Sequence, residues 1–135
     1  MKIKALSIRQ PYAERILTGE KVEEYRSWCP AYRGPLLVHA SKSKSEEGWD
    51  GLPLGCLVGL VHFGEAFWSE DESYLIWDLR SPIRFAEPIP YKGAVGLMSV
   101  PLEIVRAQLP DKLPRCYRKW AQTLSGTASR STPTR

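Results

Sequence analysis

The sequence predicts a β-rich α+β domain whose sheet is either closed or strongly curved. One segment has the apolar spacing of an amphipathic helix, whereas five or six short apolar segments have the length of strands. Glycines interrupt the longest of these segments, and glycine allows a strand to bend or bulge. The chain has 135 residues, of which 43% are hydrophobic, so it can bury the core of one small domain.

The N-terminal part of the chain carries a strand signal, a helix signal and a second strand signal. Residues 2–8 have the alternation of a strand. Pro11 suits the first turn of a helix, and the apolar positions that follow have helical spacing. Gly19 is expected to end this helix, because glycine adopts the left-handed conformation found just past helix ends. The charged stretch 18–28 is then predicted to be a second strand.

The rest of the chain is predicted to contain further strands and two short helices. The expected strands cover 36–40, 55–67, a segment around 75–77, and 94–100. Polar and proline-rich stretches at 31–34, 41–51, 69–74 and 88–93 are expected to be loops. One helical turn is expected at 101–105 and a short helix at 113–124.

These signals divide the chain into three parts. Residues 1–110 are expected to form the folded domain, and 111–124 a helical extension. Residues 125–135 contain a single apolar side chain, that of Ala128. Such a segment cannot bury enough apolar surface to offset its ordering entropy, so we expect a disordered basic tail in solution.

The net charge of +4 belongs to the C-terminal end of the chain. All acidic residues lie in 1–115, where basic residues equal them in number. The excess comes from four residues beyond that point: Arg118, Lys119, Arg130 and Arg135. A basic tail suits nucleic acid, and a solvated tail without a partner is equally consistent with the charge. Any nucleic-acid surface on the domain itself must be a local patch.

Cysteine and histidine usage predicts a cytoplasmic protein without a metal or cofactor. The three cysteines, Cys29, Cys56 and Cys116, have no CxxC spacing, which fits a reducing compartment. The only histidines are His39 and His62, and no Cys/His spacing matches a zinc site. No apolar run has the length of a membrane span or of a signal-peptide core, so we expect no membrane partner.

The charged stretch 18–28 has an unusual pattern for a strand. Because side chains alternate along a strand, it has two faces: Val22, Glu24, Arg26 and Trp28 on one, and Lys21, Glu23, Tyr25 and Ser27 on the other. If the apolar ends of the first face point inward, Glu24 and Arg26 do so as well. Buried charges need partners. The two charges form either a structural ion pair or part of a ligand cleft on which Lys21 converges.

A second polar cluster lies where the first strand leads into the helix. It contains Ser7, Arg9, Gln10 and Tyr12. Free N–H groups at a helix start favour anionic ligands, so Arg9 could hold a phosphate and Tyr12 could stack on a base. The alternative is that Tyr12 packs in the core beside Ile16 and that Arg9 is solvated.

Two further features are candidate contributors to a site. His39, Ser41 and Lys42 lie close together at the end of the strand 36–40, although such a histidine is more often a core residue. Five tryptophans are present, some of which could line a stacking pocket: Trp28, Trp49, Trp68, Trp77 and Trp120. No nucleophile elbow, phosphate-binding loop or dinucleotide fingerprint is found.

Several of these segments together resemble the ASCH domain of the PUA-like superfamily. Gly19-x-Lys21-x-x-Glu24-x-Arg26 is similar to the GxKxxExR signature of that family, and LSIRQPYA at 6–13 resembles the opening of one ASCH branch. Further similar segments follow in order at 32–42, 55–61 and 88–97. The resemblance implies a PUA-like curved β-barrel of five or six strands, with a helix after the first strand.

The resemblance also implies a cleft that binds RNA or nucleotides. Together with the patterns above, it predicts a set of binding residues: Ser7, Arg9, Gln10, Tyr12, Lys21, Glu24, Arg26, Trp28, His39, Ser41 and Lys42. Lys21, Glu24 and Arg26 are expected to line one concavity, with Arg9 or Gln10 opposite. Pleating directs Lys21 to the other face, so it must lie at the strand mouth or beside a bulge.

The activity has two competing hypotheses. The first is an RNA- or nucleotide-binding module. The second is a small hydrolase, either a ribonuclease or an amidohydrolase on a modified nucleoside such as acetylcytidine, with Lys21 and Glu24 as catalytic residues. The amidohydrolases of the superfamily have threonine where this chain has Glu24. A lysine base must also lose its proton, which a nearby carboxylate opposes, so the preferred hypotheses are binding, or RNA cleavage in which Lys21 stays charged.

Overall fold

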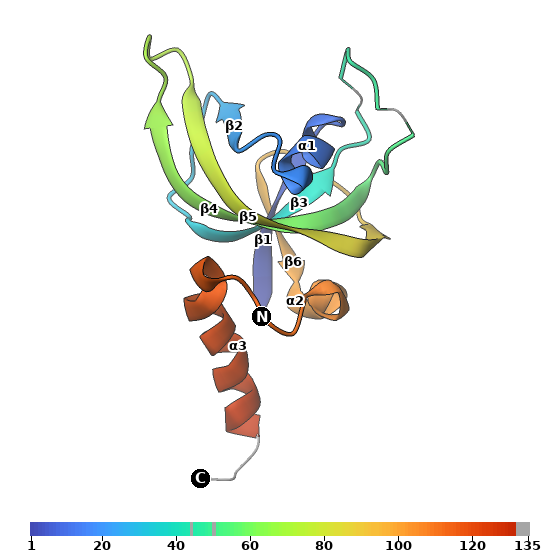
Figure 1. Cartoon of the computed structure of the whole chain (residues 1–135), viewed down its shortest axis with the longest axis vertical. Helices are drawn as coiled ribbons and strands as arrows, with labels where there is room; N and C mark the ends of the chain where they lie inside the picture. The colour runs from blue at the N-terminus through green and yellow to red at the C-terminus, as the bar shows by residue number, and fades with distance from the viewer. Residues whose placement is uncertain (44, 50, 132–135) are drawn as a thin grey trace.

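A computed structural model describes residues 1–43, 45–49 and 51–131 of the chain, and Figure 1 shows its arrangement. Six strands form one mixed sheet in the order β2-β5-β4-β3-β1-β6. The strands are β1 (Lys2–Ile8), β2 (Glu23–Arg26), β3 (Gly34–Ala40), β4 (Cys56–Trp68), β5 (Leu75–Pro90) and β6 (Leu97–Pro101). The helices are α1 (Tyr12–Thr18), α2 (Leu102–Val105) and α3 (Arg118–Ser131), with 3-10 turns η1 (Arg106–Gln108) and η2 (Arg115–Tyr117).

The sheet is strongly curved but open, so the expected closure into a barrel is not confirmed. The long strands β4 and β5 bend across the molecule (Figure 1), and their pairing contains three register shifts. Within the described residues, the edge strands β2 and β6 do not pair with each other. β2 has only four residues and pairs with the start of β5, whereas β6 pairs with β1. Bulges therefore curve the sheet without bringing its two edges together.

Several element boundaries differ from the prediction. The predicted strand over 18–28 contains only the short β2, because the chain reaches the β5 edge at Glu23. β5 continues to Pro90, through part of the segment that was expected to be a loop, because it pairs with β4 as far as Cys56. Gly19 ends α1 as expected, with a φ of +84° and its N–H bonded to the Ile16 carbonyl.

The parallel pairing between β1 and β3 places the site. Its register aligns Ser7 with His39 and Ile8 with Ala40. Side chains at the carboxyl ends of these two neighbouring strands therefore meet at the same end of the sheet. α1 follows β1 directly along the chain and covers the sheet face beside this end (Figure 1).

Each face of the sheet has its own hydrophobic cluster. On one face, Ile16 and Leu17 of α1 pack against a group that includes Phe63 and Trp77, whose rings stack at 4.6 Å. On the other face, the cluster includes Leu60, Leu102 and Tyr117. Because apolar side chains cover both faces of the sheet, the connecting loops lie at the ends of its strands.

The C-terminal segment packs on the face opposite α1. Tyr117 is fully buried, and its hydroxyl donates a hydrogen bond to the Ser81 carbonyl at 2.8 Å. The helix α3 continues to Ser131, past the end of the extension predicted at 111–124. The disorder predicted in solution for 125–135 stays a prediction, and 132–135 lie outside the described residues. Among the residues that are described, no helix has the length and hydropathy needed to cross a membrane.

Candidate functional site

Two adjoining cavities lie at the carboxyl ends of β1 and β3. The smaller has a volume of about 530 Å³ and is named the arginine cavity here, because Arg9 and Arg26 line it. The larger has a volume of about 950 Å³ and is named the histidine cavity, because His39 lines it. Four residues line both cavities: Ser7, Ser41, Ala94 and Val95.

Glu24 and Arg26 form an ion pair that also lines the arginine cavity. Glu24 is only 7% exposed, and the Arg26 Nε donates to its Oε2 at 2.8 Å. The Arg26 Nη2 donates to the Ser7 carbonyl at 2.9 Å, which ties β2 to β1. The two residues are adjacent on one strand face, as alternation predicts. The ion-pair and cleft interpretations of the sequence are therefore compatible with each other.

The apolar ends of this strand face behave differently from each other. Val22 is 56% exposed, so the condition that both apolar ends point inward is not met, because β2 begins only at Glu23. Trp28 is half-buried and lines the arginine cavity. Its ring packs edge-on against Trp77 at 5.1 Å, and the Trp77 Nε1 donates to the Trp28 carbonyl. These contacts fix the wall of the cavity that carries the indole.

Lys21 lies at the mouth of the strand, and its side chain curls toward the ion pair. Its Nζ lies 3.6 Å from the Glu24 Oε1 and also donates to the Glu23 carbonyl. The ammonium group lies 4.4 Å from the centroid of the Tyr25 ring. Lys21 lines a neighbouring cavity of about 360 Å³ rather than the arginine cavity. The expected single concavity therefore contains Glu24, Arg26 and Arg9, but not Lys21.

Arg9 and Tyr12 both line the arginine cavity, as the sequence predicts for a site there. The side chain of Arg9 is exposed. The Tyr12 hydroxyl donates to Glu47 Oε2 at 2.5 Å, and Arg15 donates to Glu47 Oε1 at 3.0 Å. The hydrogen bond from Tyr12 lowers the pKa of the Glu47 carboxyl, and the same bond raises the pKa of Tyr12. Glu47 thus holds the Tyr12 ring at the rim as a neutral phenol.

Gln10 has a structural position away from the cavities, in contrast to its predicted place in the site. Its side chain is 1% exposed and donates to the Pro53 carbonyl at 3.1 Å. Its Oε1 accepts a hydrogen bond from the Glu14 N–H in the first turn of α1. A helix start needs such an acceptor, which explains why a buried amide occupies this position.

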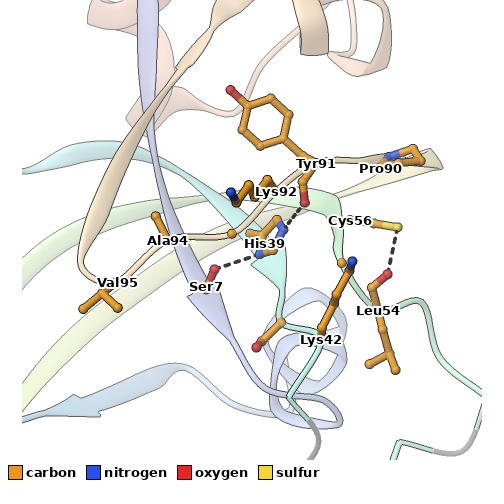
Figure 2. Close-up of a pocket in the computed structure, with 13 residues that line it drawn as sticks. Ser7, His39, Lys42, Leu54, Cys56, Pro90, Tyr91, Lys92, Ala94 and Val95 are labelled. Atoms are coloured by element: carbon orange, nitrogen blue, oxygen red, sulfur yellow. Dashed lines mark hydrogen bonds between the residues drawn. The ribbon is translucent and has the colours of Figure 1, made fainter.

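His39 occupies the back of the histidine cavity, with both ring nitrogens bonded (Figure 2). The ring is 1% exposed; Nδ1 lies 2.8 Å from the Ser7 Oγ and Nε2 lies 2.6 Å from the Tyr91 carbonyl oxygen. Ser41 and Lys42 also line this cavity, as the sequence predicts for site residues.

Sequence reasoning missed the segment that closes the histidine cavity. Tyr91, Lys92, Gly93 and Val95 line it, although they were not among the predicted site residues. The signal was present, because the segment 88–97 is among those that resemble the ASCH family. Loop residues cannot be placed without knowing which strands the loop joins. Among the described residues, no group of three or more His, Cys, Asp or Glu could hold a metal ion.

Comparison with known proteins gives a consistent family and fold. The ASCH domain family matches residues 6–100. A crystal structure of an ASCH protein from Zymomonas mobilis is similar, with a TM-score of 0.55 and 16% identity over 76% of this chain and 90% of that chain. A tyrosine-to-phenylalanine mutant of ZmASCH from the same organism gives a TM-score of 0.57, 15% identity, and coverage of 79% and 96%. No curated protein sequence matches the chain.

Proposed function

Because the chain belongs to the ASCH domain family, whose members are generally thought to bind RNA, we propose that it binds RNA or a nucleotide in the arginine cavity. The observation that carries this proposal is the composition of that cavity, where Arg9 and Arg26 lie with Tyr12 and Trp28. Guanidinium groups bind phosphate oxygens, and aromatic rings stack on bases.

The two arginines have different parts in this proposal. Arg26 already donates to Glu24 and to the Ser7 carbonyl, so its position is fixed and its charge is partly neutralised. Arg9 has no acidic partner among the described residues, and its side chain is exposed. Arg9 is therefore the better phosphate ligand, whereas the remaining N–H groups of Arg26 suit a base edge or a sugar hydroxyl.

The contacts of Lys21 favour binding over a general-base role. A lysine base must be neutral to accept a proton. The Lys21 Nζ instead pairs with Glu24 and donates to the Glu23 carbonyl, so it is engaged within the protein and does not line the arginine cavity. Glu24 in turn accepts from Arg26, so both members of the proposed catalytic pair are engaged in ion pairs.

The proposal predicts that Arg9→Ala weakens RNA binding by about tenfold, as expected for the loss of one charge-assisted contact. Affinity for a fluorescently labelled single-stranded RNA would be measured by anisotropy at fixed salt. Arg106→Ala is the matched control, because Arg106 is exposed in η1 and lines neither cavity. Equal loss of affinity in both variants would mean that the contact is a general charge effect and would contradict the proposal.

The same samples separate binding from hydrolysis. The RNA is recovered after incubation and its length is analysed, and acetate release from acetylcytidine is measured in parallel. We expect neither product. Cleavage by the wild-type protein that disappears in Lys21→Ala would instead support the hydrolase hypothesis, with Lys21 acting as a charged stabiliser.

A further inference from the structure

The histidine cavity has a fixed hydrogen-bond polarity, which follows from the two contacts of His39. The Tyr91 carbonyl can only accept a hydrogen bond, so the His39 Nε2 at 2.6 Å carries the proton. Both neighbours of the ring are neutral groups, and no carboxylate contacts it among the described residues. The ring is 1% exposed and has no countercharge in the described part of the chain, and a single proton on Nε2 satisfies both of its contacts.

This tautomer determines what Ser7 presents to the cavity. In the neutral ring with a protonated Nε2, the Nδ1 has a lone pair and accepts. The Ser7 hydroxyl, 2.8 Å away, therefore donates its only proton to His39. Its oxygen lone pairs stay available, and Ser7 lines both cavities. Toward a ligand, Ser7 is an acceptor and not a donor.

We propose that the histidine cavity binds a further base of an RNA ligand, next to the nucleotide in the arginine cavity, and selects bases with an exocyclic amino group, of which cytosine is the simplest case. This inference rests on the proposed function. An amino group donates to the Ser7 Oγ, whereas a carbonyl oxygen or a phosphate oxygen at the same point leaves two acceptors facing each other. The cavity volume of about 950 Å³ accommodates a nucleobase with adjoining sugar.

The surroundings of Ser7 make this polarity rigid. A Cβ atom at Gly93 would lie 2.8 Å from the Ser7 Oγ and 2.8 Å from the His39 Cε1, so the loop backbone packs directly on the pair. Backbone hydrogen bonds from Ser41 to Ile8 and from Tyr91 to Gly55 hold the same segments together. A hydroxyl whose partner and surrounding backbone are held in place discriminates between ligand donors and acceptors better than one in a mobile setting.

The rim of the cavity supplies positive charge at a distance from Ser7. In the view of Figure 2, Lys42 and Lys92 flank His39, and the side chains of both are exposed. Neither forms an ion pair with an acidic residue of the described chain. The lysines therefore suit phosphates that flank the bound base, while Ser7 reads the base itself.

The test compares two labelled oligoribonucleotides of equal length, oligo(C) and oligo(U), by anisotropy at one salt concentration. Cytosine and uracil have the same ring size and differ at C4, where an amino group replaces a carbonyl oxygen, and at N3, where cytosine lacks the proton of uracil. We expect the wild-type protein to bind oligo(C) about fivefold more tightly, the effect of one hydrogen bond. Equal affinity, or tighter binding of oligo(U), would overturn the inference while leaving the proposed function intact.

Variants identify the group that reads the base. Ser7→Ala should lower oligo(C) affinity to the oligo(U) level, whereas Arg9→Ala should weaken both and keep their ratio. Ser99→Ala is the matched serine control, because Ser99 bonds to Lys4 at the β6 edge and lines neither cavity. A preference for oligo(C) that persists in folded Ser7→Ala, verified by circular dichroism, would overturn the inference. Failure of the wild-type protein to bind either oligonucleotide would instead contradict the proposed function.

Discussion

At the residue scale, a buried carboxylate organises the arginine cavity. Glu24 lies between Arg26 at 2.8 Å and Lys21 at 3.6 Å, and it is almost fully buried. A carboxylate in such a position needs both partners, because an unpaired buried charge is strongly unfavourable. The alternation of the strand predicted the Glu24–Arg26 pair. The approach of Lys21 depends on how the preceding residues reach the β5 edge, which alternation does not describe.

The pair gives a stability prediction. Glu24→Gln keeps the shape of the side chain but leaves Arg26 half-buried without its countercharge. The free energy of unfolding, measured by urea titration at pH 7, should fall by about 1–3 kcal/mol. Asp78→Asn is the control, because its partner Arg80 has a side chain that is 65% exposed, and it should cost less than about 1 kcal/mol. Equal effects would mean that burial adds nothing to the Glu24 pair.

A partly buried tyrosine gives a pH prediction. Burial raises the pKa of Tyr32 from 10.0 to about 12. The unfolded chain releases this proton near pH 10 and the folded chain does not, so the free energy of unfolding falls as pH rises from about 10 toward 12. Tyr32→Phe should make this fall shallower, as measured by urea unfolding at several alkaline pH values. An unchanged slope would show that Tyr32 ionises freely in the folded protein.

At the element scale, packing of α1 on the sheet depends on a close approach to β4. Gly59 in β4 lies beneath Leu17 of α1, where a Cβ atom would clash with the Leu17 methyl groups. The same atom would lie 2.5 Å from the Ile83 carbonyl oxygen of β5, which is part of a paired strand and cannot move freely. The sequence indicated that glycine here allows a bend. The structure adds a steric reason for glycine, which is the seating of the helix.

The close packing of α1 on β4 predicts different losses of stability for two glycine substitutions. Gly59→Ala should destabilise by about 2–3 kcal/mol through overpacking against backbone. Gly19→Ala should cost only about 1 kcal/mol, because its φ of +84° strains an alanine but open space surrounds it. Urea unfolding of both variants measures the difference. A smaller loss for Gly59→Ala than for Gly19→Ala would contradict the packing argument.

At the scale of the whole molecule, α1 and the C-terminal segment lie on different sides of one sheet. α1 is on one side, whereas α2, η2 and the start of α3 are on the other (Figure 1). The pairing of Ser7 with His39, and of His39 with Leu57 of the second cluster, places the back of the histidine cavity on the side of the C-terminal segment. Tyr117 belongs to the second hydrophobic cluster, so the segment beyond 110 contributes to the folded core. The domain boundary predicted at 110 stays a prediction.

The arrangement predicts that stability and binding can be separated. Tyr117→Ala should lower the free energy of unfolding by about 3–5 kcal/mol, the cost of emptying a large buried aromatic site. RNA affinity of the remaining folded protein should stay unchanged, because the residues of η2 are not among those that line either cavity. Urea unfolding and anisotropy test the two parts. A parallel loss of affinity at a temperature where the variant is folded would show that the C-terminal segment is coupled to the cavities.

What the sequence determined by itself is local. Side-chain alternation placed Glu24 and Arg26 on one face, helical spacing located α1, and the left-handed preference of glycine located its end at Gly19. These features depend on neighbouring residues only, so a pattern of a few positions is enough to predict them. The order of similar segments also predicted the family, which a match over residues 6–100 confirms.

What only the tertiary structure decided is which distant segments meet. The parallel pairing of β1 with β3 aligns Ser7 with His39, and the long β5 brings Tyr91 and Gly93 onto that pair. The same pairings leave the sheet open where a barrel was expected. Strand partners are selected by the burial of whole faces, a property of the folded chain that no local pattern contains. For this reason the hydrogen-bond polarity of the histidine cavity became visible only in three dimensions.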